Sequence, residues 1–300
     1  IARGKGDQKE AERIMGNAFS MLLITGVILT VIGLVFKRPL LYAFGASDAT
    51  YPYADSYLTI YLLGTVFVMT SLGLNAYINA QGFARIGMVT TLIGAVLNII
   101  LDPVFIFIFN MGVQGAAIAT VISQAASAAW TFRFLTGNGT ILRIRLSSMK
   151  PRWKTIGSIT SLGLSGFMMS ITNSIVQVVC NSTLSTCGGD LYVGVMTVVN
   201  SIREIVTMPV TGITNGSQPV ISFNYGAGKY DRIKKAIRFM SISCIGYTVA
   251  IWGILHLFPV FFIHIFNTQP DLVEAAVPSM QIYYFGFFMM SLQFSGQTVF

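Results

Sequence analysis

The chain has 300 residues, of which 54% are hydrophobic and only 10% are charged, and its net charge is +8. Soluble domains carry about 25% charged residues, so this composition excludes an ordinary soluble protein. Apolar runs of roughly 20 residues recur along the chain and are typical of transmembrane helices, because a helix satisfies its own backbone hydrogen bonds in lipid. We therefore expect an all-α integral membrane protein, and the positive charge does not call for a nucleic-acid partner.

Charged segments and Gly- or Pro-containing breaks divide the chain into about eight apolar spans. In chain order the predicted spans are 17–36, 54–77, 86–109, 113–135, 157–182, 191–222, 239–266 and 276–300.

Basic residues gather on one side of the membrane when the spans alternate in direction. Only Lys37 and Arg38 fall on the opposite side. By the positive-inside rule the basic side is cytoplasmic. The predicted cytoplasmic segments of this multi-pass protein are 1–16, 80–86, 136–156 and 224–238.

The chain contains a weak internal repeat. At an offset of 222 residues, Gly4 and Gly6 fall on Gly226 and Gly228, and a charged loop, an apolar span, a short loop and a second span recur in order. An even number of spans separates the two copies, so they are predicted to be parallel repeats. Such repeats predict two helical bundles with a cavity between them, as alternating access requires.

The predicted domains are an N-terminal lobe at 1–135, a basic interlobe linker at 136–156 and a C-terminal lobe at 157–300. The linker contains no acidic residue. We expect it to act as a hinge that lies against anionic lipid headgroups.

Asp102 is the first candidate site residue, because a charge inside a span costs at least about 2.5–3.5 kcal/mol. Asn98 lies one helical turn before it, and Thr120 is expected at a similar depth on the next helix. Pro103 has no N–H to donate and opens the helix here. The side-chain oxygen atoms of these three residues, together with a backbone carbonyl left without its helical partner, suit a proton or a hard cation such as Na⁺. Alternatively, Asn98 and Asp102 only cap the opened helix and join it to Thr120.

Arg203 and Glu204 also place charges within a predicted span. Glu204 can attract a cationic substrate, or the two charges can serve only to neutralise each other or a neighbouring helix. Methionines suit a promiscuous pocket, although apolar residues in membrane helices also face lipid or other helices. The candidate methionines of a substrate cavity are Met168, Met169, Met196, Met208 and Met289.

Other kinds of site find little support in the sequence. The three cysteines form no CxxC pair, and His256 and His264 have no acidic or cysteine partner nearby in the sequence. Neither HExxH nor GxSxG occurs, so we expect no enzyme, no cofactor and no metal site beyond Na⁺ at Asp102. A channel is disfavoured because the charged residues do not form rings.

Several motifs resemble the multidrug and toxic compound extrusion (MATE) family over essentially the whole chain. They are Asn75 to Gly82 (NAYINAQG), Asn98 to Pro103 (NIILDP), Gly112 to Thr120 (GVQGAAIAT), Met208-Pro209, Gln218-Pro219 and Asn224 to Gly228 (NYGAG). The resemblance implies a bacterial-type plasma-membrane transporter with two six-helix bundles. It implies that this chain holds helices three to six and seven to ten, and that the first two and last two lie outside it.

The resemblance also implies mechanism. In the DinF-like multidrug branch an N-lobe cation site uses positions matching Asn98, Asp102 and Thr120, together with an Asp on the first helix. The NorM-like branch uses acids on the seventh and tenth helices, and neither 157–182 nor 276–300 contains one.

The expected function is therefore efflux of lipophilic or cationic drugs in exchange for H⁺ or Na⁺ by a monomer whose other partners are membrane lipids. The alternative is a lipid-linked oligosaccharide flippase. A flippase would need a basic cavity, whereas Arg203 is the basic residue deep in a span.

Overall fold

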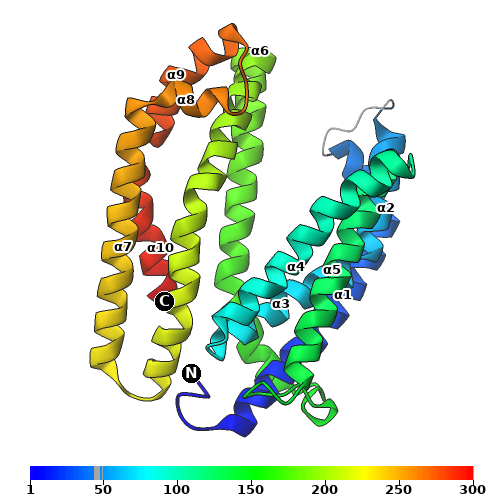
Figure 1. The fold of residues 1–300 in the computed structure, drawn as a ribbon, viewed down its shortest axis with the longest axis vertical. Helices are drawn as coiled ribbons and strands as arrows, with labels where there is room; N and C mark the ends of the chain where they lie inside the picture. The colour runs from blue at the N-terminus through cyan, green and yellow to red at the C-terminus, as the bar shows by residue number, and fades with distance from the viewer. Residues whose placement is uncertain (44–47, 49, 300) are drawn as a thin grey trace. The chain divides into compact units, whose positions relative to one another are not determined.

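The structure is a computed structural model that describes residues 1–43, 48 and 50–299, and every regular element among them is a helix (Figure 1). The α-helices are α1 (Gln8–Ala43), α2 (Tyr51–Leu63), α3 (Thr65–Ala80), α4 (Ala84–Pro103), α5 (Gly112–Thr136), α6 (Trp153–Gly226), α7 (Tyr230–Leu257), α8 (Pro259–His264), α9 (Pro270–Tyr284) and α10 (Met290–Val299). Shorter turns are the π-helix η1 (Val104–Ile108) and the 3₁₀ turns η2 (Leu146–Ser148) and η3 (Phe287–Met289). The expected all-α class is confirmed.

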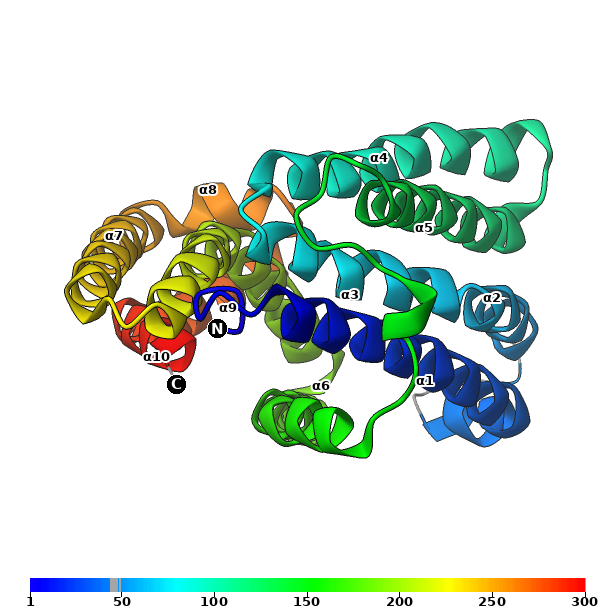
Figure 2. The same ribbon diagram turned by 90° about the horizontal axis from the view of Figure 1, so that it is seen from below.

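The chain divides into two compact units. One contains Gly6–Thr160 together with Ala2, and the other contains the chain from Ser161 onward together with Ile1 and Arg3–Lys5. In the first unit α1 packs on α2 and α3, and α5 packs on α2, α3 and α4 (Figure 2). In the second, α7 packs on α10 and η3, and α8 packs on α9.

Five helices within the described residues are long and apolar enough to cross a membrane, or six when the bent pair α2 and α3 is taken as one span. The element α6 is two such helices, Trp153–Leu184 and Leu191–Gly226. They meet near Gly189, whose φ of 66° and ψ of −168° are not helical. A glycine adopts this backbone without the steric cost that a Cβ brings.

Three predicted spans are broken rather than continuous. The span at 54–77 bends by 52° between α2 and α3, on either side of Gly64. The span at 239–266 is interrupted at Phe258, because the residue before a proline, here Pro259, is disfavoured in helical conformation. The span at 276–300 is divided between α9, η3 and α10, and Phe300 lies outside the described residues.

The internal repeat recurs in local backbone geometry. Gly6 and Gly228 have φ of 81° and 68°, and the breaks after Gly64 and at Gly286 also lie 222 residues apart. The loop hydrogen bonds repeat with the same offset: Lys5 N to Ile1 O (3.1 Å), Ala227 N to Phe223 O (3.0 Å), Asp7 N to Ala2 O (3.2 Å) and Lys229 N to Asn224 O (2.9 Å). The two copies thus share a turn as well as a pattern of apolar residues.

A reciprocal contact joins the two repeated loops. A Cβ placed on Gly4 would collide with the carbonyl oxygen of Phe223, and a Cβ on Gly226 would collide with the carbonyl oxygen of Ile1. Ile1 and Phe223 are themselves 222 residues apart. Only glycine permits this approach of backbone to backbone at both positions.

The segment 137–152, which we call the strap, is bound to the rest of the first unit by side chains of α1 and by Gln81, the residue directly after α3. The Gln81 side-chain oxygen accepts hydrogen bonds from the backbone N–H groups of Ile141 (3.0 Å) and Leu142 (2.7 Å) and from the Thr140 hydroxyl (2.8 Å). Asn17 donates to the Ser148 carbonyl at 3.1 Å and accepts from the Arg152 N–H at 2.8 Å. The strap is therefore held against this unit by hydrogen bonds, and its expected role as a hinge stays a prediction.

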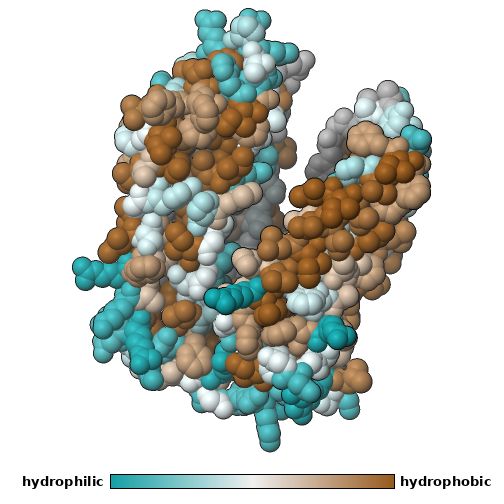
Figure 3. Space-filling model, in the orientation of Figure 1, coloured by the Kyte–Doolittle hydropathy of each residue, from teal (hydrophilic) through white to brown (hydrophobic). Residues whose placement is uncertain are grey.

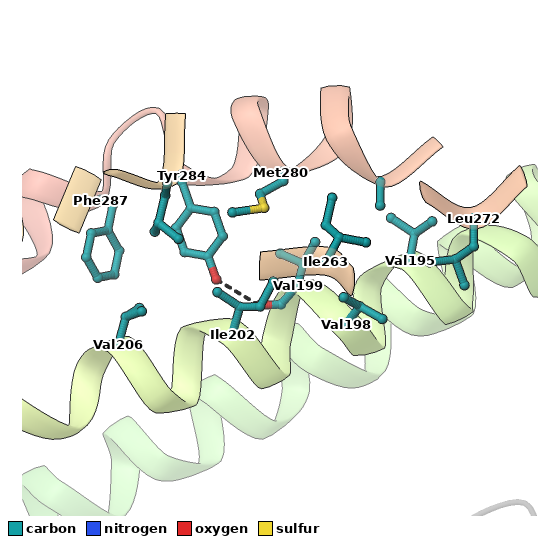
Figure 4. Packing of buried hydrophobic residues seen from close by; sticks show 12 residues of the cluster. Val195, Val198, Val199, Ile202, Val206, Ile263, Leu272, Met280, Tyr284 and Phe287 are labelled. Atoms are coloured by element: carbon teal, nitrogen blue, oxygen red, sulfur yellow. Dashed lines mark hydrogen bonds between the residues drawn. The ribbon is translucent and has the colours of Figure 1, made fainter. Parts of the chain in front are cut away.

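The core of the second unit lies between the second half of α6 and α9 (Figure 4). Val199, Ile202, Met280 and Tyr284 are each at most 1% exposed. The Tyr284 hydroxyl donates to the Val199 carbonyl at 2.8 Å, which satisfies the polar end of a buried ring.

Large apolar side chains remain exposed along the helices. They include Val96, Ile99, Ile100 and Phe107 of α4 and η1, each at least 51% exposed. In Figure 3 such side chains cover α4, while hydrophilic ones gather near the turn between α6 and α7. A helix surface of this kind is suited to lipid rather than water.

Candidate functional site

Asn98, Asp102 and Thr120 lie together where α4 packs on α5. The Asn98 side-chain N–H donates to an Asp102 carboxylate oxygen at 3.0 Å and lies 3.4 Å from the Thr120 hydroxyl oxygen. The Thr120 hydroxyl donates to the Ala116 carbonyl at 2.9 Å. All three side chains are half-buried. Asn98 thus bridges a carboxylate on its own helix and a hydroxyl on the next one.

Small residues allow the two helices to approach at this point. A Cβ on Gly94 would lie 2.7 Å from the Ser127 hydroxyl oxygen, and one on Gly115 would lie 2.8 Å from the Phe105 backbone. Such small residues let helix backbones come close enough for short polar side chains to meet across the interface.

The helix changes geometry directly after Asp102. α4 ends at Pro103 and continues as the π-helix η1, in which the Phe109 N–H donates to the Val104 carbonyl at 3.0 Å. Proline has no N–H for the usual helical bond, and the wider π turn follows it. π-Helical turns occur frequently at functional sites, but the same geometry is also compatible with a purely structural cap.

The cluster offers oxygen ligands when the Asn98 amide rotates. In the observed arrangement its N–H group faces Asp102, which suits a hydrogen-bonded carboxylate. Rotation by half a turn would present the amide oxygen beside the carboxylate and the Thr120 hydroxyl, a donor set suited to Na⁺. Within the described residues there is no group of three or more His, Cys, Asp or Glu side chains that could hold a metal ion.

A polar pocket of about 220 Å³ lies beside this cluster, between α3, α4 and α5. Asn98 and Thr120 form part of its wall. The remaining wall residues are Ser71, Leu72, Asn75, Thr91, Gly94, Ala95, Ser123, Gln124 and Ser127. The sequence does not single out this pocket, although the spacing of Ser123 and Ser127 by one helical turn signals a polar face on α5.

Arg203 and Glu204 do not pair with each other. Arg203 is half-buried and Glu204 is exposed, and neither takes part in an ion pair within the described residues. Arg203 lies close enough to Tyr283 of α9 for an electrostatic interaction. The Tyr283 hydroxyl in turn lies 3.4 Å from the Asn200 side-chain oxygen. Arg203 thus lies within electrostatic range of a polar group on a neighbouring helix, and Glu204 is exposed.

The five candidate methionines lie outside the buried clusters of the second unit. Met208, Met289 and Met168 are 64%, 59% and 54% exposed, and Met169 and Met196 are half-buried. None of them is packed in the three buried clusters of the described part of the chain. Their side chains are free to contact lipid or a ligand.

An ion pair that the sequence does not predict joins α1 and α2. The Lys37 ammonium lies 2.8 Å from the Asp55 carboxylate and also donates to the Thr59 hydroxyl at 3.1 Å. Both charged side chains are about a quarter to a third exposed. The 18-residue separation of the partners leaves no local signal in the sequence.

Taken together, the apolar helices and the duplicated turns define a multi-pass helical membrane protein. The MatE family model matches residues 2–104 and 166–300, which is well over half of the chain. The chain therefore belongs to the MatE family, as its motifs indicate.

Curated relatives include proteins called multidrug export protein MepA. The one from Staphylococcus aureus (strain MSSA476) is 28% identical over 283 residues, covering 92% of this chain and 61% of the relative. The one from Staphylococcus haemolyticus (strain JCSC1435) is 27% identical over 256 residues, covering 85% of this chain and 56% of the relative. The chain thus spans about three fifths of the length of these curated relatives.

Solved structures share the fold. A multidrug resistance MATE family transporter of the MOP superfamily in an outward-facing conformation matches with a TM-score of 0.93 at 22% identity, covering 100% of this chain and 67% of that one. A MOP superfamily transporter from Pyrococcus furiosus matches with a TM-score of 0.88 at 22% identity, covering 100% and 70%. At these identities the likeness establishes the architecture.

Proposed function

We propose that this protein is a secondary active multidrug efflux transporter that exports lipophilic or cationic compounds in exchange for H⁺ or Na⁺ by alternating access. Membership of the MatE family and the drug-export names of the relatives support the class of activity. The relatives in these comparisons do not favour a lipid-linked oligosaccharide flippase. Transport needs no enzymatic step and no cofactor beyond the coupling ion.

The cluster of Asn98, Asp102 and Thr120 carries the proposal for ion coupling. A carboxylate within a membrane helix is costly, and such residues commonly serve in ion or proton transfer. Here the carboxylate has one hydrogen-bond donor, the Asn98 amide, which also lies 3.4 Å from the Thr120 hydroxyl oxygen, so proton or Na⁺ uptake would change the partners of that amide. A change of partners at a helix interface is a means of favouring one conformation over another.

The substrate would be bound by residues of the second unit. Glu204 supplies an exposed negative charge for an organic cation. The exposed methionines Met168, Met208 and Met289 supply adaptable apolar surface, and Met169, Met196 and Arg203 complete the proposed lining. Coupling requires that ion and drug favour different conformations or compete for one site. We propose that the protein works as a monomer surrounded by lipid.

The test is transport by the full-length protein in proteoliposomes under an imposed pH or Na⁺ gradient, scored with a fluorescent organic cation. We expect gradient-dependent movement of the dye, and Asp102→Asn should abolish it while the protein still inserts and folds. Glu274→Gln, which alters an exposed acid of α9, is the matched control and should transport normally.

Normal transport by Asp102→Asn would show that the carboxylate has only a structural role, because the asparagine amide oxygen can accept the same hydrogen bond from Asn98. Dye movement that is independent of both gradients would contradict antiport altogether.

A further inference from the structure

A second cavity, of about 200 Å³, opens at the C-terminal end of α5, on the side that the positive-inside rule assigns to the cytoplasm. Its wall consists of Trp130, Arg133 and Phe134 of α5 and of Gly137 and Gly139 of the strap. The Trp130 ring is 37% exposed and Arg133 is exposed as well. Two aromatic rings and a guanidinium group therefore share one open wall.

Arg133 has no acidic partner in the described part of the chain. It takes part in no ion pair there, and no acidic residue occurs in the sequence between Asp102 and Asp190. Its place in the last turn of α5 suits a cation, because the helix dipole is negative at that end, but supplies no separate anion. An anion that binds the guanidinium directly therefore comes from outside the described chain.

The turn after α5 offers further hydrogen-bond donors. Asn138 and Gly139 are exposed, and among the described residues their backbone N–H groups donate to no other backbone group. A guanidinium fork and the N–H groups of a turn are donors that suit a phosphate group. The polar part of the cavity thus fits a phosphate, whereas the Trp130 and Phe134 rings fit an apolar chain.

The strap next to this cavity has the composition of a membrane interface. Leu146 on the strap and Trp153 directly after it are both 85% exposed, more than any other large hydrophobic side chain of the described residues. Basic residues surround them in the sequence, among them Arg152 and Lys154. Exposed tryptophan beside lysine and arginine is typical of the headgroup region on the cytoplasmic side. The cavity therefore lies at the level of the lipid headgroups.

We propose that this cavity binds one anionic phospholipid of the cytoplasmic leaflet. The lipid phosphate lies at Arg133 and the turn after α5, and the first part of an acyl chain lies against Trp130 and Phe134. A free phosphate ion would gain nothing from these rings, so the occupant is a lipid. This site goes beyond the proposed transport activity and does not depend on it.

The test uses Trp130 as a fluorescent reporter in the full-length protein. The chain has three tryptophans, so Trp153→Phe and Trp252→Phe, with any tryptophan outside this chain replaced in the same way, leave Trp130 alone. The protein is placed in phosphatidylcholine vesicles, and phosphatidylglycerol or phosphatidylcholine with brominated acyl chains is added as quencher. We expect half of the quenching at an about fivefold lower mole fraction of the anionic lipid, because one arginine attracts it.

Arginine variants show whether the preference belongs to this cavity. Arg133→Gln should remove the preference for phosphatidylglycerol, and Arg133→Lys, which keeps the charge, should retain most of it. Arg232→Gln is the matched control, because it removes an exposed arginine at the start of α7 that has no ion pair in the described part of the chain. This variant should keep the parental preference.

Three results would overturn the proposal. Equal quenching by the two lipids in the parent would mean that Trp130 meets only bulk lipid. Quenching by neither lipid would mean that another part of the full-length protein covers the cavity. Loss of the preference in both Arg133→Gln and Arg232→Gln would assign it to the overall positive charge of the cytoplasmic side. Because quenching reports lipid contact whether or not the protein transports, a failure of the proposed function would leave this test intact.

Discussion

The side-chain oxygen of Gln81 accepts a hydrogen bond from the backbone N–H of Leu142 at 2.7 Å, across 61 residues of sequence. It does so at the C-terminal end of α3, and it accepts from Thr140 and Ile141 as well. One amide therefore holds the start of the strap, where Leu142 packs in the core of the first unit.

We predict that Gln81→Leu destabilises the protein, because it leaves buried donors of the strap without their acceptor. Each such group costs about 1–3 kcal/mol. The measurements are the thermal unfolding midpoint and the rate of limited proteolysis within 137–152, and we expect a lower midpoint and faster cleavage there. Gln293→Leu, at an exposed position of α10, is the control. Unchanged proteolysis would mean that the strap does not depend on Gln81.

Thr120 permits a test of the ion cluster that leaves the carboxylate in place. Thr120→Val keeps the shape of the side chain but removes the hydroxyl near Asn98, so we expect a weaker dependence of dye efflux on the imposed ion gradient. Thr120→Ser retains the hydroxyl and should restore most of that dependence. A normal gradient dependence in Thr120→Val together with a loss of it in Thr120→Ser would indicate that the methyl group, and hence packing, is what matters at this position.

The repeated turns predict a paired effect of glycine substitution. Gly228→Ala forces a side chain into the left-handed region at φ of 68°, which costs about 1–2 kcal/mol, and Gly6→Ala should behave alike at φ of 81°. Gly246→Ala is the matched control, because it lies within α7 with open space around it and alanine favours a helix. Thermal unfolding should rank both turn variants below this control.

Tyr284→Phe removes one buried hydrogen bond and leaves the ring in place. The lost bond to Val199 should lower the free energy of unfolding by about 0.5–1.5 kcal/mol. Tyr53→Phe, at a ring that is 64% exposed, should change it little. A stability equal to that of the parent would show that water replaces the hydroxyl as donor to the Val199 carbonyl.

The sequence by itself determined the class of the protein. In lipid the backbone must satisfy its own hydrogen bonds, and uniformly apolar runs of about 20 residues do so as helices, so composition and run length predict an all-helical membrane fold, which is confirmed. The motifs likewise predict the family, and the MatE match confirms it. The repeat at 222 residues was visible because turn glycines such as Gly6 and Gly228 are required by their backbone conformation.

Tertiary structure alone decided which distant residues meet. Asn98 and Asp102 share a helix face by their spacing, but the contact of Asn98 with Thr120 depends on how α4 and α5 are rotated against each other. The same holds for the polar pocket, for the hydrogen bonds between Gln81 and the strap, and for the ion pair of Lys37 and Asp55. Helical periodicity fixes which face a side chain occupies, whereas the partner across the interface is set by packing of small and large residues, which has no local signature.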